Sequence, residues 1–248
     1  MQIVQSNLSE LHWASSNAVD SLICKKLLPR LFIFLLFPPI LNDNIEEIMA
    51  STGKHVVFDV VGTCVSYEAF FDGIEARMGE RLRAEGIKSR LFGFAWMEAA
   101  ERECSYLDRS DRYVPFWTVF QPLFFRILWM AGIQEPRKFA TEEDAAFMVG
   151  EYRKLAARPG VQECWARLRG AGFTVWAVTT GDAARVQRYL ANAGVELPTE
   201  NFVTCDDLGV AKPSLEVYKH VLNKFPGADE KWFAAAHMWD TSAAKQAG

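Results

Sequence analysis

Acidic, basic and hydroxyl side chains follow the apolar strands that this sequence predicts, near the point where each strand ends. The residues that share this position are Asp59, Thr63, Thr179, Thr180, Lys212 and Asp240. Because the carboxyl ends of parallel strands meet at one edge of a sheet, we expect these side chains to converge there. A carboxylate beside a lysine and hydroxyl groups suits covalent catalysis in which an aspartate is the nucleophile.

Each of these residues also has an ordinary structural explanation, which the sequence leaves open. Asp59 ends an apolar run, where a carboxylate is costly unless it is paired or used, but it could simply cap the following turn. Thr179 and Thr180 could cap the next helix, and Asp240 could cap a helix that begins after it. Lys212 could be a solvated surface lysine. Their joint occurrence at strand ends favours a site.

The elements that must position these side chains alternate between strands and helices. Strands are predicted at 56–58, 174–182, 202–207 and 232–240, and helices at 160–172, 182–194 and 212–225. Such alternation indicates βαβ units and a parallel sheet, so we expect an α/β fold.

A long helical stretch separates the first strand from the rest of this pattern. Helices are predicted at 67–86, 91–107, 115–133 and 141–157, and no strand signal interrupts them. Thr141 is the expected N-cap of the last of these helices. We therefore expect a helical insertion after the first strand.

The composition limits the partners and the compartment. The chain has 248 residues, 50% of them hydrophobic, and a net charge of −4, without a basic block that would indicate nucleic acid. Its five cysteines have no metal-binding spacing, which favours reduced thiols in a cytoplasmic protein. Cys64 lies five residues after Asp59, but no histidine close in the sequence would activate it as a nucleophile.

Residues 1–48 differ from the rest of the chain. An apolar run at 31–37 is shorter than the roughly 20 residues that a membrane-spanning helix needs. A second methionine, Met49, directly precedes the first predicted strand. We expect residues 1–48 to be a disordered extension or a misassigned start, with a membrane anchor as the weaker alternative.

Four motifs occur in a recognisable order. They are FDVVGT at 58–63, the strand that ends at Thr179, AKP at 211–213 and the apolar run that ends at Asp240. This order resembles the haloacid dehalogenase superfamily of aspartate-nucleophile hydrolases, over residues 54–248. The resemblance implies a Rossmann-like parallel-sheet core at 49–65 and 150–248, with a helical cap at 66–149. Members of that family continue beyond the last motif, so we expect a truncated C-terminus.

Two departures indicate the branch of the superfamily. Phosphatases carry a general-acid aspartate where this chain has Val61, and magnesium-using members carry an acidic residue near Ala235 and Ala236. A valine cannot donate a proton to a leaving alcohol. The sequence therefore resembles the metal-free L-2-haloacid dehalogenase type, which implies a small-molecule substrate and no metal or cofactor. A homodimer is a further expectation.

The resemblance implies a role for each motif residue. Asp59 would be the nucleophile, Lys212 would balance its charge, Thr63 and Thr179 would orient it, and Asp240 would activate water. Residues expected to contact the substrate are Arg90, Trp96, Thr180, Tyr218 and His237.

Some of these substrate contacts have open alternatives. Arg90 matches a residue that holds the leaving halide, but it could be an exposed arginine at a helix start. Tyr218 could serve helix packing instead. His237 could be a general base near neutral pH or merely a buried residue at a strand end.

Three positions depart from the dehalogenase pattern and put the substrate in doubt. They are Ala235 in place of a serine, and His237 and Thr180 in place of asparagines. A hydrolase of another substrate, such as a phosphate ester, and a catalytically inactive binding protein therefore remain alternatives to dehalogenation.

Overall fold

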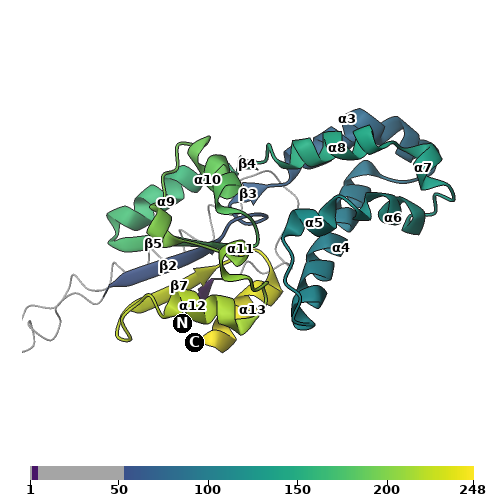
Figure 1. Cartoon of the computed structure of the whole chain (residues 1–248). Coiled ribbons are helices and arrows are strands. Elements are labelled where there is room, and N and C mark those ends of the chain that lie inside the picture. The colour runs from purple at the N-terminus through teal and green to yellow at the C-terminus, as the bar shows by residue number, and fades with distance from the viewer. Residues whose placement is uncertain (1, 5–52) are drawn as a thin grey trace, which may run out of the picture.

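A parallel sheet forms the core of the computed structural model, which describes residues 2–4 and 53–248 (Figure 1). Within these residues the sheet has five strands in the order β1-β7-β2-β5-β6. The strands are β1 Gln2–Val4, β2 Lys54–Asp59, β5 Phe173–Thr179, β6 Phe202–Thr204 and β7 Glu230–Ala234. The central place of β2 brings its carboxyl end, and Asp59, to the middle of one sheet edge.

Helices cover both faces of the sheet because alternate side chains of each strand point to opposite sides. Val56 and Phe58 pack in a cluster with residues of α9 (Val161–Gly170) and α10 (Ala183–Ala191). Val57 packs in a second cluster with residues of α12 (Leu215–Leu222) and α13 (Met238–Ala247). A short helix, α11 (Cys205–Leu208), and a 3₁₀ turn at Thr199–Asn201 complete the core.

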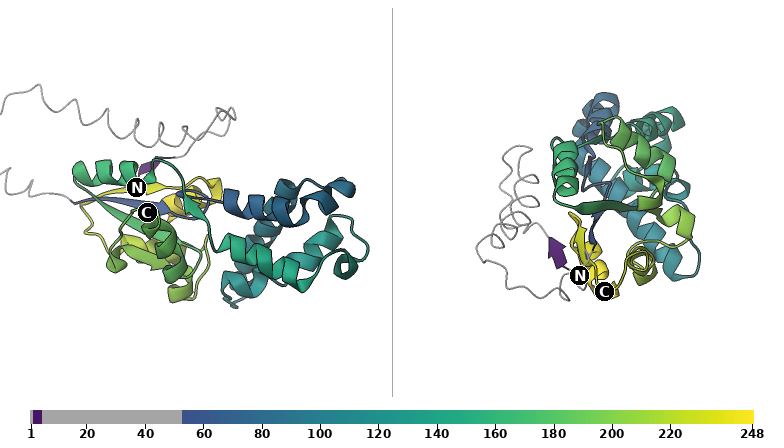
Figure 2. Two further views of the ribbon diagram at one scale, coloured as in Figure 1. Left: turned by 90° about the horizontal axis from the view of Figure 1, so that it is seen from above. Right: turned by 90° about the vertical axis from the view of Figure 1, so that its left-hand side faces the viewer.

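A helical cap is inserted after β2 and lies beyond the carboxyl end of that strand (Figure 2). Its helices are α3 Glu68–Ala84, α4 Ser89–Arg109, α5 Phe116–Phe120, α6 Leu123–Met130, α7 Pro136–Phe139 and α8 Glu142–Tyr152. The chain leaves the core through β3 (Val65–Ser66) and returns through β4 (Ala156–Ala157), and these two short strands pair antiparallel. The predicted α/β fold with an inserted cap is therefore confirmed.

The structure corrects several predicted elements. The single helix predicted at 115–133 is two helices, because Pro122 lacks the N–H that a continuous helix would need. The strand predicted at 232–240 ends at Ala234, so Asp240 lies in the first turn of α13. The pair β3 and β4 was not predicted, since two-residue strands leave no periodic signal. Thr141 caps α8 as predicted, and Asp144 completes a capping box with it.

Part of the N-terminal segment belongs to the sheet. Residues 2–4 form β1, which pairs parallel with β7 from Gln2 opposite Trp232 to Val4 opposite Ala234. The expectation of an unstructured extension does not describe these three residues. Residues 5–52, with the apolar run at 31–37, lie outside the described part of the chain. Among the described helices, none is both long enough and apolar enough to cross a membrane.

Close packing of α3 against α4 generates a stability prediction at Gly93. A Cβ atom at this position would lie 2.5 Å from Ile74 Cδ1 and 3.0 Å from Phe71 Cδ1, both buried in the cap. We expect Gly93→Ala to lower the free energy of unfolding by about 1–3 kcal/mol, the usual cost of overpacking a core. Chemical denaturation of the purified variant measures this change.

Gly150 in α8 provides the matched control, because a Cβ there would meet no atom within 4 Å. Gly150→Ala should raise the free energy of unfolding by about 0.5–1 kcal/mol through helix propensity alone. Equal stabilisation by both substitutions would contradict the close approach of α3 and α4.

Candidate active site

Asp59 ends β2 and receives hydrogen bonds on both carboxylate oxygens. Lys212 Nζ donates to Asp59 Oδ1 at 3.0 Å, and the Thr63 hydroxyl donates to Asp59 Oδ2 at 2.6 Å. The Asp59 side chain is buried, so these donors replace the water that a carboxylate would otherwise bind. This environment differs from that of a residue that only caps a turn, which was the alternative role that the sequence left open for Asp59.

Lys212 joins two carboxylates beneath the cap. Its Nζ also donates to Asp240 Oδ2 at 2.9 Å and to the carbonyl oxygen of Val178 at 3.1 Å. All three N–H donors of the ammonium group are thereby used. Tyr218 donates its hydroxyl to the other oxygen of Asp240, Oδ1. Lys212 is therefore a buried, fully bonded cation and not a surface lysine.

The charges of this cluster shift the pKa values of its members. Burial alone would raise the pKa of Asp59, but Lys212, His237 and Thr63 outweigh it and lower that pKa to about 2. Burial and the charge of Asp59 raise the pKa of Asp240, against the opposing effect of Lys212. Burial alone would lower the pKa of Lys212, but the two carboxylates raise it above its ordinary value. Asp59 and Lys212 are consequently an ionised pair at neutral pH.

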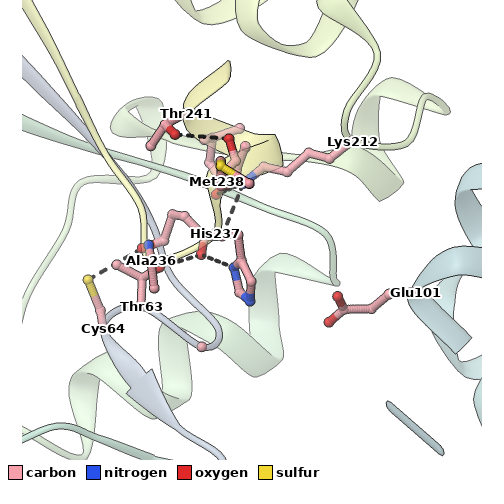
Figure 3. A network of polar contacts seen from close by, with 12 residues as sticks. Thr63, Cys64, Glu101, Lys212, Ala236, His237, Met238 and Thr241 are labelled. Atoms are coloured by element: carbon pink, nitrogen blue, oxygen red, sulfur yellow. Dashed lines mark hydrogen bonds and ion pairs between the residues drawn. The ribbon is translucent and has the colours of Figure 1, made fainter. Parts of the chain in front are cut away.

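The orientation of Thr63 follows from its two partners. Its hydroxyl oxygen accepts the backbone N–H of Ala236 at 2.9 Å, which leaves the hydroxyl proton for Asp59 (Figure 3). Gly62 precedes it at φ 91°, and a Cβ there would lie 2.8 Å from His237 Cε1. Arg158 holds the same turn through the carbonyl oxygens of Gly62 and Thr63. The turn after β2 is therefore held by hydrogen bonds from the backbone N–H of Ala236 and from the side chain of Arg158.

A cavity of about 450 Å³ opens in front of this cluster, between the core and the cap. From the core it is lined by Asp59, Val61, Thr179, Thr180, Arg185, Lys212, Pro213, His237 and Trp239. From the cap and the return to the core it is lined by Glu98, Glu101, Arg102, Ser105, Tyr106, Phe116 and Tyr152. Its size suits a small molecule.

One polar face of α4 forms the cap wall of the cavity, and the sequence analysis missed it. Its residues are Glu98, Glu101, Arg102, Ser105 and Tyr106, at the i, i+3, i+4, i+7 and i+8 spacing of a helix face. In the sequence, these polar residues recur at helical spacing along the same helix as the apolar core positions, and this second pattern could have indicated a cavity wall. Ser105 also donates a hydrogen bond to the carbonyl oxygen of Lys212 at 3.0 Å, which ties the cap to the core.

His237 stands beside the nucleophile candidate with an unused ring nitrogen. Its Nδ1 lies 3.7 Å from Asp59 Oδ2, an ion-pair contact longer than a hydrogen bond, and no described atom forms a hydrogen bond with this buried nitrogen. The contact with Asp59 raises the pKa of His237, while burial opposes the shift. The ring stacks on Trp239, and Figure 3 shows Glu101 facing it from the cap.

The structure does not bring Arg90 and Trp96 to the cavity. Arg90 lies near the surface of the cap, where it donates two hydrogen bonds to Glu68 and covers the ring of Phe71. Trp96 is fully buried in the cap and donates its indole N–H to the carbonyl oxygen of Phe120 at 2.7 Å. Both side chains therefore have structural partners instead of the predicted contact with substrate.

The remaining predicted residues take different positions. Thr179 and Thr180 line the cavity beside Asp59, and the N-cap of the next helix is Asp182 instead. Tyr218 lies behind Asp240 and is absent from the cavity wall. The buried thiol of Cys64 donates to the backbone oxygen of Asp59, and burial raises its pKa well above the ordinary value, which opposes a thiolate nucleophile.

The side chains at the site do not suit a divalent cation. Val61, Ala235 and Ala236 offer no side-chain oxygen, and both oxygens of Asp59 and of Asp240 already accept hydrogen bonds. Within residues 53–248, no group of three or more acidic, histidine or cysteine side chains has the arrangement of a metal site. A magnesium ion would need more oxygen ligands than this cluster supplies.

Comparisons with known proteins agree with these features. A family model described as haloacid dehalogenase-like hydrolase matches residues 54–248. The (S)-2-haloacid dehalogenase 4A of Burkholderia cepacia is 24% identical over 201 residues, which cover 81% of this chain and 82% of that protein. The motif order in the sequence is thereby confirmed as a family resemblance.

Solved structures share the fold. The L-2-haloacid dehalogenase from Xanthobacter autotrophicus matches with a TM-score of 0.62 and 24% identity, covering 79% of this chain and 75% of that one. A dehalogenase solved as an intermediate complex matches with a TM-score of 0.63 and 18% identity, covering 80% and 83%. At such identities the likeness extends to the fold alone.

The carboxyl group of Glu101 generates a pH prediction. Burial in the cavity wall, with Glu98 and Asp59 nearby, raises its pKa to about 7. Between its ordinary pKa of 4.5 and about 7, the folded state keeps a proton that the unfolded state releases, so stability falls as pH rises through this window. Glu101→Gln removes this pH dependence. The melting temperature of the variant minus that of wild type should therefore increase as the pH is raised from 4.5 to 8.

Thermal melts of both proteins across this pH range measure the difference. Glu103→Gln, on the same helix but outside the cavity lining, controls for the loss of one charge from α4. A difference between Glu101→Gln and wild type that stays constant over the range would mean that Glu101 is not held protonated.

Proposed function

This chain belongs to the haloacid dehalogenase-like hydrolase family, and from that premise we propose that it hydrolyses a small 2-haloacid with Asp59 as the nucleophile. The observation that carries the proposal is the buried Lys212, which bonds to Asp59 and Asp240 at 3.0 and 2.9 Å. A lysine in this position keeps Asp59 ionised without a metal. The relatives named as haloacid dehalogenases support the choice of substrate class.

The first step is displacement at carbon. A carboxylate oxygen of Asp59 attacks the carbon that carries the halogen, the carbon–halogen bond breaks, and halide leaves with the bonding electron pair. The product is an ester between the substrate and Asp59. Because the pKa of Asp59 is about 2, the nucleophile is charged at every pH near neutrality. Thr63 and Lys212 hold the carboxylate toward the cavity during the attack.

The second step is hydrolysis of this ester. Water attacks the carboxyl carbon of Asp59 and His237 Nδ1 accepts its proton. The bond between that carbon and the ester oxygen then breaks, and His237 returns the proton to the leaving oxygen to release a 2-hydroxy acid. The carboxyl group of Asp59, with its pKa of about 2, loses its proton to water and is a carboxylate again. Ester formation removes the negative charge of Asp59, which is the main group that raises the pKa of His237. Loss of that charge lowers the pKa of His237 and so favours its neutral form, which can accept a proton, at the moment when a base is needed.

Asp240 has a supporting part in this proposal. Its two carboxylate oxygens already accept hydrogen bonds from Lys212 and Tyr218, and the side chain is fully buried. It holds Lys212 against Asp59 and so preserves the charge balance when Asp59 is esterified. This role replaces the water activation that the resemblance implied for Asp240.

A phosphate-ester hydrolase is the second candidate, and Glu101 is the observation that favours it. The general acid that Val61 cannot provide could be supplied from the cap, because Glu101 faces the cavity with a pKa of about 7. A carboxyl group protonated at neutral pH can protonate a leaving alcohol.

Parallel assays of the purified protein separate these functions. We expect chloride release from L-2-chloropropionate, no phosphate release from an aryl phosphate, and no loss of chloride release with a chelator. Asp59→Asn should lower chloride release by on the order of 10³-fold or more, because an amide is a poor nucleophile. Asp72→Asn, an exposed carboxylate on α3, is the matched control and should keep wild-type activity.

Three results would contradict the proposal. Phosphate release that requires magnesium would favour the phosphatase. Full activity in Asp59→Asn would remove the nucleophile. A protein that releases neither product yet binds a carboxylic acid would be a binding protein of the same fold.

A further inference from the structure

Arg185 is a buried cation in the wall of the cavity. It is the third residue of α10, its side chain is only 9% exposed, and it lines the same cavity as Asp59, Thr179 and Thr180. An arginine is charged at any pH where proteins fold, so its burial needs compensating groups. Its position on a helix gave no signal in the sequence, and neither step of the proposed reaction uses it.

Three contacts hold the guanidinium group in one orientation. Arg185 Nε donates to Asp182 Oδ2 at 3.1 Å, and Nη1 donates to the Tyr189 hydroxyl at 3.3 Å. Its Cζ atom lies 4.9 Å from the ring centroid of Trp117 in the cap. Tyr189 is itself fixed, because its hydroxyl donates to the carbonyl oxygen of Tyr152 at 2.6 Å.

The contacts with Asp182 and Tyr189 do not use the second amino group of Arg185, Nη2. Among the described residues 2–4 and 53–248, no acceptor receives a hydrogen bond from Nη2. A Cβ built at Gly181 would lie 1.9 Å from Nη2, so this nitrogen lies directly on the backbone next to Thr180. Only a glycine leaves room for it there.

The charge of Arg185 is only partly compensated. Its one carboxylate partner within the described part of the chain, Asp182, has a side chain that is 42% exposed and shares its interaction with water. An anion in the cavity would complete the compensation. The other cations in the cavity wall are less suited, because Lys212 uses all its donors within the cluster and Arg102 is exposed.

We infer that Arg185, through Nη2 and with Thr180 in the same cavity wall, binds the carboxylate of the substrate and so positions the reacting carbon at Asp59. The inference rests on the proposed function for the identity of the anion. It explains how the site can bind a carboxylate although Thr180 and Ala235 replace polar groups that the resemblance led us to expect, and although Arg90 lies outside the cavity.

The competing explanation is that Arg185 is only a packing element between the core and the cap. Arg153 is the matched control for this explanation. Its guanidinium group also stacks on Trp117, at 5.0 Å, but it is exposed and absent from the cavity wall. A packing role predicts similar consequences for the two arginines, whereas a binding role predicts consequences for Arg185 alone.

Calorimetric binding of propionate and of the neutral propionamide tests the inference without any turnover. Wild type should bind propionate and prefer it to propionamide by at least tenfold. Arg185→Met should weaken propionate binding by about 10- to 100-fold, the usual loss for a hydrogen bond to a charged group. Arg185→Lys should recover part of the affinity, and Arg153→Met should retain all of it.

Kinetics with 2-chloropropionate supply a second readout. Arg185→Met should raise KM by a factor similar to the loss in propionate affinity, with a smaller change in kcat. Arg102→Gln, which removes the exposed cavity arginine, should change KM less than Arg185→Met does. Thermal melts of each variant establish that it is folded.

The outcomes separate the inference from the proposed function. Propionate affinity that is unchanged in folded Arg185→Met, or equally reduced in Arg153→Met or Arg102→Gln, overturns the assignment of Arg185. If wild type binds propionamide with the same affinity as propionate, the assignment of Arg185 is also overturned, even if Arg185→Met does not fold. Propionate binding that depends on Arg185, without halide release from any 2-haloacid, keeps the anion site and overturns only the proposed reaction.

Discussion

The ammonium group of Lys212 is the contact on which the rest of the site depends. It is buried with bonds to Asp59, Asp240 and the carbonyl oxygen of Val178. Removing one partner from a buried ion pair is strongly destabilising, so the three acceptors must be present together. They come from β2, from α13 and from β5, which fixes the relative positions of three elements. The same contact keeps Asp59 ionised, so one interaction serves the fold and the proposed chemistry.

The core and the cap make different contributions to the cavity. The core supplies charged groups whose positions are fixed by the sheet, whereas the cap supplies one polar face of α4. Ser105 donates to the carbonyl oxygen of Lys212, so the cap contacts the residue that organises the core. Trp117 of the cap covers Arg185 of the core. A substrate between the two layers would be shielded from water, which strengthens each charged contact inside the cavity.

The sequence was sufficient to predict the residues at strand ends. Asp59 and Thr63 were found because parallel strands end at one edge and because both follow an apolar run. Lys212 was found because it follows the strand predicted at 202–207, although in the structure α11 lies between β6 and Lys212. The cavity residues Arg185 and Glu101 were missed because they lie on helices, where only the three-dimensional docking of the cap brings them near Asp59. Arg90 was placed at the site by motif alone, and its partner Glu68 on the neighbouring helix could not be read from spacing. Pro122 was the local signal that should have divided the helix at 115–133.

The central claim is that Asp59 forms an ester with the substrate, and isotope transfer in a single turnover tests it most directly. Excess protein is mixed with L-2-chloropropionate in water enriched in oxygen-18, quenched, and digested for mass spectrometry of the Asp59 peptide. The account predicts that Asp59 gains one oxygen-18 and that the hydroxyl oxygen of the released lactate is unlabelled, because that oxygen comes from Asp59. Labelled lactate with an unlabelled Asp59 would mean that water attacks the substrate directly, and it would contradict the account.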